Sequence, residues 1–166
     1  ALPLAGPGDQ IWAKAGIYKP TYLPDRTATF QLKNNVAVYG GFAGTETALL
    51  QRNPATYVST LSGDIGAAGN TSDNSYHVVT GNATAATAML DGITITAGNA
   101  NAASPHDSGG GMYNNAGSPT LSNLTLNANS AVWGGGMFND ASYPIVINLT
   151  FSANSATWGG GMENIN

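Results

Sequence analysis

Apolar and polar residues alternate in short runs along the whole chain, and a helical period is almost absent. The runs "NVAVYGGF" (35–42), "TYVSTLSGD" (56–64) and "SYHVVTG" (75–81) are rich in β-branched and aromatic residues, and clusters of Gly, Asn and Pro separate them. This pattern predicts short β-strands joined by tight turns. Only "TETALLQR" (45–52) departs from it, and there we expect one or two short helical turns capped by Thr45.

The second half of the chain repeats with a constant spacing. The motif "GGGM" begins at Gly109, Gly134 and Gly159, which are 25 residues apart. Each repeat contains runs such as "PTL", "LTL" and "GGMFN", which predict three short strands. A unit of this size cannot bury its apolar face alone, so we expect successive units to stack as coils. Each residue would then lie about 4.8 Å above its equivalent one coil below.

A weaker copy of the repeat lies upstream. "GITITAGNA" (92–100) matches "NLTLNANSA" (123–131) with an offset of 31 residues. The additional residues fall in "NAASPHDSGGG" (101–111), which we interpret as a lengthened loop. The earlier apolar runs are expected to be less regular turns of the same coil.

Stacked coils place equivalent residues in columns. Met112, Met137 and Met162 predict an interior column. The glycines would allow a positive φ, or a close approach to the neighbouring coil. Asparagines repeat with the same spacing and predict ladders of hydrogen-bonded amides along the axis, with αL bends at the second set. The three sets are Asn114, Asn139 and Asn164; Asn123 and Asn148; and Asn129 and Asn154.

Two aromatic columns are the main candidates for ligand contact. Trp133 and Trp158 would stack in one column, and Tyr113 and Phe138 in another, which Glu163 interrupts. Exposed aromatic columns can bind sugar rings. Large aromatic side chains are also commonly buried against a neighbouring turn, and this packing interpretation is favoured. A polysaccharide is therefore kept as a candidate partner.

Composition and charge exclude several classes of protein. Charged residues make up 8% and apolar residues 42% of the 166, which does not fit a disordered chain. Without cysteine, neither a disulfide framework nor a Cys-zinc site can form. All five basic residues lie within the first 52 positions, so a nucleic-acid footprint and a basic membrane helix are both absent. No apolar run reaches the roughly 18 residues of a membrane span.

The acidic residues and histidines do not predict a catalytic or metal site. With 25-residue coils, Asp140 and Glu163 have no carboxylate at the equivalent position of the neighbouring coil, so no carboxylate column forms. Asp64 and Asp91 are the one pair that could approach each other, as glycoside hydrolysis requires, although turn capping is the favoured interpretation. His77 is expected in a strand, and His106 in a solvated loop beside Asp107.

Two further patterns have surface interpretations. Asn70 and Asn82 begin Asn-x-Ser/Thr sequences and would be glycosylation acceptors if the host glycosylates secreted proteins. Thr94, Thr125 and Thr150 share one register and would form a threonine column. Ice-binding solenoids use such columns, but usually two in parallel, and the sequence indicates one.

Nearly the whole chain resembles proteins of known fold. "SPTLSNLTLNANSAVWGGGMFN" (118–139) resembles the repeat of polymorphic outer-membrane-protein-like surface proteins. "GDQIWAKAGIYKP", "FQLKNNVAVYGGFAGTE" and "LSGDIG" resemble the first coils of bacterial pectin-lyase-like proteins. The resemblance implies a right-handed parallel β-helix. Its enzymatic members use acidic residues to bind calcium or to act on the glycosidic bond, often with Arg or Lys as base, and the repeats here have no basic residue. The fold alone does not settle function.

We therefore predict an all-β protein with one domain, residues 1–166. It would be a right-handed parallel β-helix with about 25-residue coils and an irregular N-terminal capping region. Its expected parts are an N-terminal cap with the first coils (1–54), irregular coils (55–87) and regular repeats (88–166).

Function is predicted from the regular repeats and the open coil end. The chain stops inside a repeat at "GGGMENIN", where no cap covers the last coil. It would be either a fragment of a longer repeat protein or a chain whose copies pair end to end into filaments. We expect a secreted or cell-surface structural or adhesive protein, from which any export signal is absent. The alternative is a polysaccharide lyase, a glycoside hydrolase-like protein, or a fragment of one, with calcium as its candidate cofactor.

Overall fold

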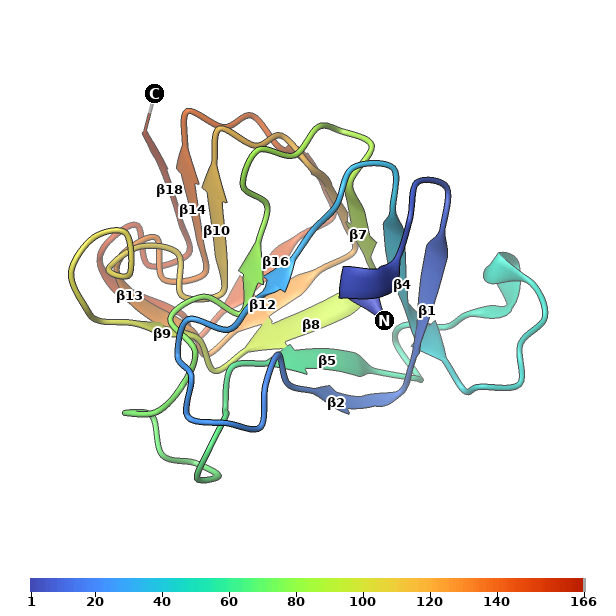
Figure 1. The fold of residues 1–166 in the computed structure, drawn as a ribbon, viewed down its shortest axis with the longest axis horizontal. Helices are drawn as coiled ribbons and strands as arrows, with labels where there is room; N and C mark the ends of the chain where they lie inside the picture. The colour runs from blue at the N-terminus through green and yellow to red at the C-terminus, as the bar shows by residue number, and fades with distance from the viewer. Residues whose placement is uncertain (166) are drawn as a thin grey trace.

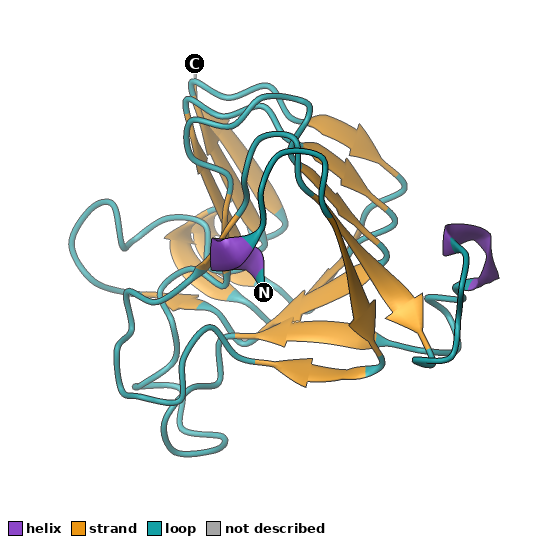
Figure 2. Cartoon of the chain, turned by 45° about the vertical axis from the view of Figure 1, so that its right-hand side comes forward, coloured by secondary structure: helices purple, strands orange, loops and turns teal. Residues whose placement is uncertain are grey.

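The computed structural model describes residues 1–165 as an all-β molecule with parallel strands in stacked sheets. Figures 1 and 2 show the strands arranged around a common interior, with loops projecting from the corners. This is the arrangement expected of a β-solenoid. Each set of consecutive strands that occupies one level of the stack is called a coil below, and residues 1–165 form five such coils.

The first two coils are the least regular. Coil 1 contains β1 (Gln10–Lys14), β2 (Gly16–Tyr18) and β3 (Phe30–Gln31), and coil 2 contains β4 (Ala37–Phe42), β5 (Ser59–Ser62) and β6 (Val79–Thr80). Two short 3-10 helices lie outside the sheets, η1 (Leu2–Leu4) and η2 (Leu49–Gln51).

The last three coils each add a fourth strand. Coil 3 contains β7 (Met89–Asp91), β8 (Ile93–Thr96), β9 (Asn99–Ala100) and β10 (Met112–Asn115). Coil 4 contains β11 (Thr120–Ser122), β12 (Thr125–Asn127), β13 (Ser130–Trp133) and β14 (Met137–Asp140). Coil 5 contains β15 (Ile145–Ile147), β16 (Thr150–Ser152), β17 (Ser155–Trp158) and β18 (Met162–Ile165).

Strands at the same place in successive coils pair in parallel. Three sheets extend through all five coils, in the orders β1-β4-β7-β11-β15, β2-β5-β8-β12-β16 and β3-β6-β10-β14-β18. The fourth sheet, β9-β13-β17, begins in coil 3. Neighbouring strands in every sheet therefore come from different coils, as stacking requires.

The register confirms the repeat that the sequence predicts. Met112 pairs with Met137 and Met137 with Met162, so coils 4 and 5 match without insertion. The weaker copy is also confirmed, because Thr94 pairs with Thr125. The upstream runs become β4, β5 and β6, which pair with the strands of coil 3.

The interior is a continuous apolar core that runs through the coils. Leu90, Ile95, Met112, Leu121 and Met137 are among its fully buried members. They alternate along their strands with outward-facing residues, which is the period-2 pattern of the sequence.

The glycine triplets lie at turns and at close contacts between coils, as the sequence predicts. Gly134 has a φ of +58°, a conformation that favours glycine. Gly135 packs against the next coil so closely that a Cβ atom would lie 2.4 Å from the carbonyl oxygen of Ser155. The first glycine thus makes the turn, and the second lets two coils approach.

Asparagine amides join the coils in ladders. The Asn114 side chain donates to Asn139 over 2.7 Å, and Asn139 donates to Asn164 over 2.7 Å. Asn148 donates to Asn123 over 2.8 Å, and both residues have positive φ values, as expected at the bend. The third set is joined by a hydrogen bond from Asn129 to Asn154.

The predicted helical turn at 45–52 forms, but Thr45 does not cap it. The 3-10 helix η2 occupies Leu49–Gln51. The Gln51 side-chain oxygen accepts hydrogen bonds from the backbone N–H groups of Thr47 and Ala48 instead. Glu46 accepts hydrogen bonds from the backbone N–H groups of the preceding turn. The longer side chains of Gln51 and Glu46 therefore serve as the acceptors at this helix, in place of Thr45.

Replacing Gly135 by Ala should destabilise the fold by at least about 2 kcal/mol, because the added methyl group meets backbone oxygens of coil 5. Gly160 is the matched control. It occupies the same repeat position, but a Cβ there has no neighbour closer than 3.5 Å. Gly160→Ala should change stability by less than about 1 kcal/mol. Urea unfolding of both variants checks this, and equal losses would contradict the close-approach account.

Replacing Asn139 by Leu should cost about 2–3 kcal/mol, because the buried Asn114 amide then loses its partner. Asn127 is the control, since it lies on the outer face of the same coil and its side chain makes no hydrogen bond to the described residues. Asn127→Leu should stay within about 0.5 kcal/mol of the wild type. Thermal and urea unfolding would measure both, and a neutral Asn139→Leu would refute a stabilising ladder.

Candidate functional site

Coil 5 leaves apolar interior positions open to solvent. Val146 is 43% exposed, whereas the residue it pairs with in coil 4, Leu121, is 0% exposed. Met162 is 38% exposed against 0% for Met137. All four strands of this coil pair on one side only within the described chain. The coil therefore combines unpaired backbone groups with an uncovered apolar interior, the properties of an interaction surface.

The opposite end of the stacked sheets, at coil 1, is partly covered by η1. Leu2 packs against the core and lines an apolar cavity of about 230 Å³ together with Ile11, Phe30 and Leu32. Figures 1 and 2 show η1 lying over the opening of coil 1. Leu4 of the same helix is 91% exposed. The two ends therefore differ in shape, and both present apolar side chains.

The aromatic columns form, but only one of them is accessible. Trp133 and Trp158 stack with their ring centroids 5.5 Å apart, and Trp158 is 55% exposed. Tyr113 and Phe138 also stack, but they are 7% and 6% exposed. The favoured packing interpretation is therefore confirmed for Tyr113 and Phe138, and their candidate role in sugar contact is corrected, because the rings of His77, Tyr113 and Phe138 stack on one another. Binding of a ligand at the tryptophans stays a prediction.

The sequence did not predict that the two histidines would meet. His77, just before β6, is buried, and its Nδ1 lies 3.1 Å from the carbonyl oxygen of Gly109. Its Nε2 lies 3.1 Å from Nδ1 of His106, in the lengthened loop. His106 also stacks on Tyr76, with ring centroids 4.5 Å apart. The loop is thus folded back onto coil 2, rather than being freely solvated as expected.

Burial changes the protonation of His77. Loss of hydration lowers its pKa to about 4, and the neighbouring His106 acts in the same direction. Hydrogen bonding to Gly109 and the charge of Asp107 oppose this shift but do not overcome it. His77 is therefore neutral in the folded protein at neutral pH.

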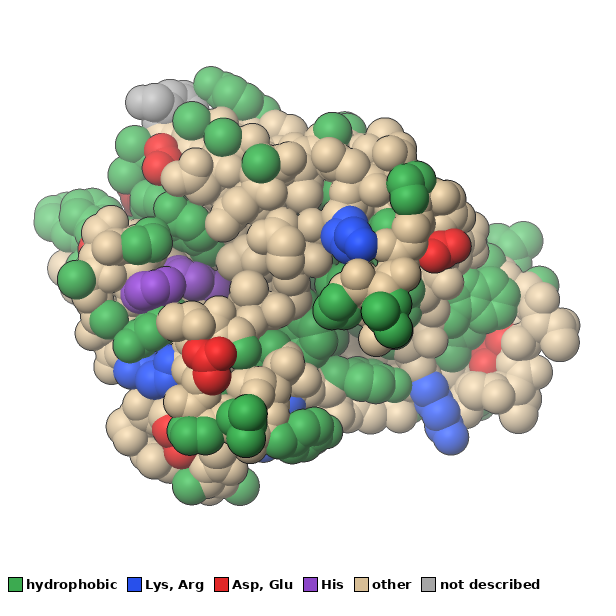
Figure 3. Space-filling view, in the orientation of Figure 1, with side chains coloured by type: hydrophobic (Ala, Val, Ile, Leu, Met, Phe, Trp, Pro, Cys, Tyr) green, Lys and Arg blue, Asp and Glu red, His purple; other side chains and the backbone are tan. Residues whose placement is uncertain are grey.

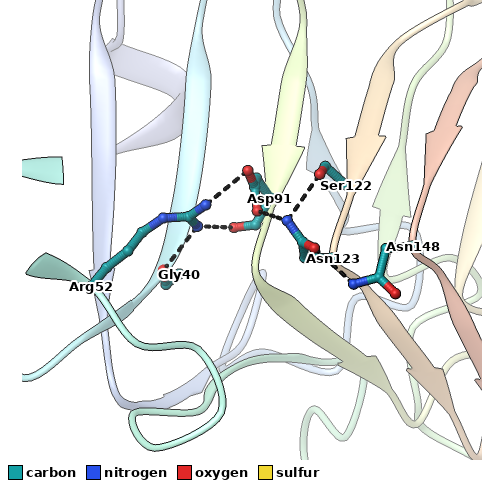
Figure 4. A network of polar contacts seen from close by, with 6 residues as sticks. All are labelled: Gly40, Arg52, Asp91, Ser122, Asn123 and Asn148. Carbon is teal, nitrogen blue, oxygen red and sulfur yellow. Dashed lines mark hydrogen bonds and ion pairs between the residues drawn. The ribbon is translucent and has the colours of Figure 1, made fainter. Parts of the chain in front are cut away.

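A polar network links the first half of the chain to the repeats (Figure 4). The Arg52 guanidinium lies 2.9 Å from the Asp91 carboxylate, and both side chains are largely buried. Asp91 also accepts a hydrogen bond from Asn123, which in turn accepts one from Asn148. The network borders an open hollow between the 43–58 loop and the coils. It ties this loop to coil 3 and extends the asparagine ladder with an ion pair.

The carboxylates are not arranged for glycoside hydrolysis. Asp91 ends β7 and pairs with Arg52, whereas Asp64 follows β5 and lies 3.9 Å from Lys19. The structure does not bring Asp64 and Asp91 together as a pair, because each turns to its own cation. Asp140 pairs in register with Asn115 and Ile165, as the spacing predicted.

Most basic residues have structural partners. Arg26 donates to the carbonyl oxygens of Asn74 and Asn99 and lies over the ring of Tyr76. Lys33 donates to the carbonyl oxygens of Pro3 and Ala5, near η1. With Lys19 and Arg52 engaged by carboxylates, these four cations serve to hold loops in place.

The two candidate glycosylation sites differ in accessibility. Asn70 lies in an exposed loop, where its side chain contacts Ser72 and Asp73. Asn82 is half-buried and its side-chain oxygen accepts from the backbone of Asn115. Thr84 of the same sequence is buried and bonded to Gly81. A modifying enzyme would therefore reach Asn70 more readily than Asn82.

Across residues 1–165, no group of three or more His, Cys, Asp or Glu side chains is placed to hold a metal ion. No helix in the described part of the chain is long and apolar enough to cross a membrane.

No protein-family model, curated protein or solved structure matches this chain. Function must therefore be argued from the molecule itself.

Acidification should destabilise the protein through His77. The unfolded chain binds a proton near pH 6.5, whereas the folded chain does so only near pH 4, so stability is lost as pH falls through this window. Between pH 7 and pH 5 the loss from this residue is about 2 kcal/mol. Urea unfolding in EDTA-containing buffer at both pH values measures it, with His77→Phe expected to remove most of the difference. An unchanged pH dependence in that variant would contradict the assignment.

Proposed function

We propose that this chain is a structural or adhesive protein whose solenoid is extended by stacking a second copy onto coil 5. The single observation that carries the proposal is the uncovered end coil, with its unpaired strand edges and its exposed Val146 and Met162. An open, apolar β-edge pairs readily with another strand. Its site of action is proposed to be outside the cell or on the cell surface.

The opposite end of the molecule supports a head-to-tail contact. Coil 1 also has unpaired edges, at β1, β2 and β3. Ile17 and the 3-10 helix residue Leu4 are strongly exposed there. In a head-to-tail stack Leu4 would enter the uncovered interior of the neighbour's coil 5. Such a contact joins two different surfaces and does not close, so it generates filaments.

The ion pairing of the carboxylates favours this role over catalysis. Asp64 and Asp91, the one carboxylate pair considered for hydrolysis, have separate cationic partners. Arg52, one of the basic residues outside the repeats, is held by Asp91. These ion pairs stabilise the fold. In the described structure, no residue packs against coil 5 on the side away from coil 4.

We further propose that the solenoid is right-handed, as in the β-helix proteins that the sequence resembles. Parallel strands joined by a crossover are almost always connected with this hand, because strands twist to the right.

Assembly should appear as a concentration-dependent increase in sedimentation coefficient, with linear particles in electron micrographs. Val146→Lys should abolish it, because a charge would then have to be buried at the contact. The control is Val132→Lys, which places the same charge at an exposed position on β13, on the side of the solenoid.

Monomers at every concentration, or equal assembly of Val146→Lys, would overturn the head-to-tail proposal. In that case the open coil would serve to continue one longer polypeptide. Calcium-dependent release of unsaturated products from polygalacturonate would replace the structural role with the carbohydrate-active alternative.

A further inference from the structure

The hydrogen bonds of His77 determine which of its ring nitrogens carries the proton. The Gly109 carbonyl oxygen can only accept, so Nδ1 of His77 must be the donor across their 3.1 Å contact. In the neutral ring, Nε2 then carries a lone pair, and it points towards His106. A backbone carbonyl that fixes the tautomer in this way is the usual support of a metal-binding histidine.

The distance between the two histidines suits a shared ion. Nε2 of His77 and Nδ1 of His106 are 3.1 Å apart. Two imidazole nitrogens on one tetrahedral Zn²⁺ lie about 3.3 Å apart, given Zn–N bonds of about 2.0–2.1 Å. We propose that His77 and His106 form a binding site for a transition-metal ion such as Zn²⁺, which takes the place of the proton between them. On binding, His106 changes tautomer: the proton on its Nδ1 moves through solvent to its Nε2, so that both rings bind the ion as neutral imidazoles and no net proton is released.

Both rings are held in position before any ion arrives. His77 stacks on Tyr113, with ring centroids 4.9 Å apart. His106 stacks on Tyr76, whose other neighbour is the Arg26 guanidinium, 4.1 Å from the ring centroid. Little side-chain freedom is therefore lost on binding, which favours affinity.

The ion would reach the site from the His106 side. His106 is half-buried and a histidine side chain is visible at the surface in Figure 3, whereas His77 is buried. Since the described residues supply no group of three acidic, cysteine or histidine ligands, water would complete the coordination. Imidazole ligands favour Zn²⁺, Cu²⁺ and Ni²⁺ over Ca²⁺ and Mg²⁺. The positive charge of Arg26, which lies over Tyr76, opposes binding of a cation, whereas the negative charge of the Asp107 carboxylate assists it.

Metal binding would anchor the 101–111 loop to coil 2. His106 lies in this loop and His77 lies two residues before β6, so one ion would join residues 29 positions apart in the sequence. The inference is independent of end-to-end assembly, because neither histidine lies in coil 5 or in η1.

The experiment is a Zn²⁺ titration of tag-free protein by calorimetry, together with Cu²⁺ paramagnetic resonance. The wild type should bind one ion per chain, and the Cu²⁺ spectrum should show two imidazole nitrogens. His106→Phe keeps the stacking ring but removes the ligand, and it should weaken Zn²⁺ binding at least about tenfold and leave one nitrogen. His77→Phe should do the same. Ser104→Ala, at an exposed position in the same loop, is the control and should bind as the wild type does.

Circular dichroism establishes that each variant is folded, and His106→Phe carries the test if His77→Phe does not fold. A wild-type spectrum with one nitrogen, or Zn²⁺ affinity unchanged in His106→Phe, would overturn the proposal and leave only the hydrogen bond between the rings. Ca²⁺ and Mg²⁺ should not compete with Zn²⁺, and competition by either would equally contradict an imidazole site.

Discussion

The parallel pairing of each coil with the next is the constraint on which the rest of the structure depends. Every strand finds its partner in another coil, so no coil is satisfied alone. The fixed inter-strand spacing brings equivalent residues together and turns sequence repeats into columns. It also leaves no room for a side chain at Gly135, where consecutive coils approach most closely.

Parallel pairing fixes the length of the strands in each coil but not the length of the loops between them. Coils 4 and 5 have the same length. The additional residues of coils 1 to 3 lie between strands and form loops that project from the sheets. Those loops carry most of the charged groups and both histidines. They are held to the coils by specific polar contacts, such as Arg52 with Asp91 and His106 with His77.

Much of the fold could be predicted because its information is local and repeated. A 25-residue spacing determines which residues pair, so Met137 and the ladder position Asn139 could be placed from the sequence alone. The loop contacts could not be placed, since nothing repeats there. His77 and His106 meet because a single lengthened loop folds back. The favoured burial of Tyr113 is confirmed, but the His77 ring that stacks on it could not be identified, because period-2 alternation predicts the face of a strand and not what covers that face.

The asparagine ladders restrict which coils can stack more strictly than backbone pairing does. Asn114 donates to Asn139, which donates to Asn164, so every amide in this row is oriented the same way. A strand edge accepts almost any partner strand, but a ladder continues only when the incoming coil supplies a matching amide at that one position. An unrelated β-edge without this amide would leave the last asparagine of the row without a partner, so under the proposed assembly the row would favour a neighbour that carries the repeat.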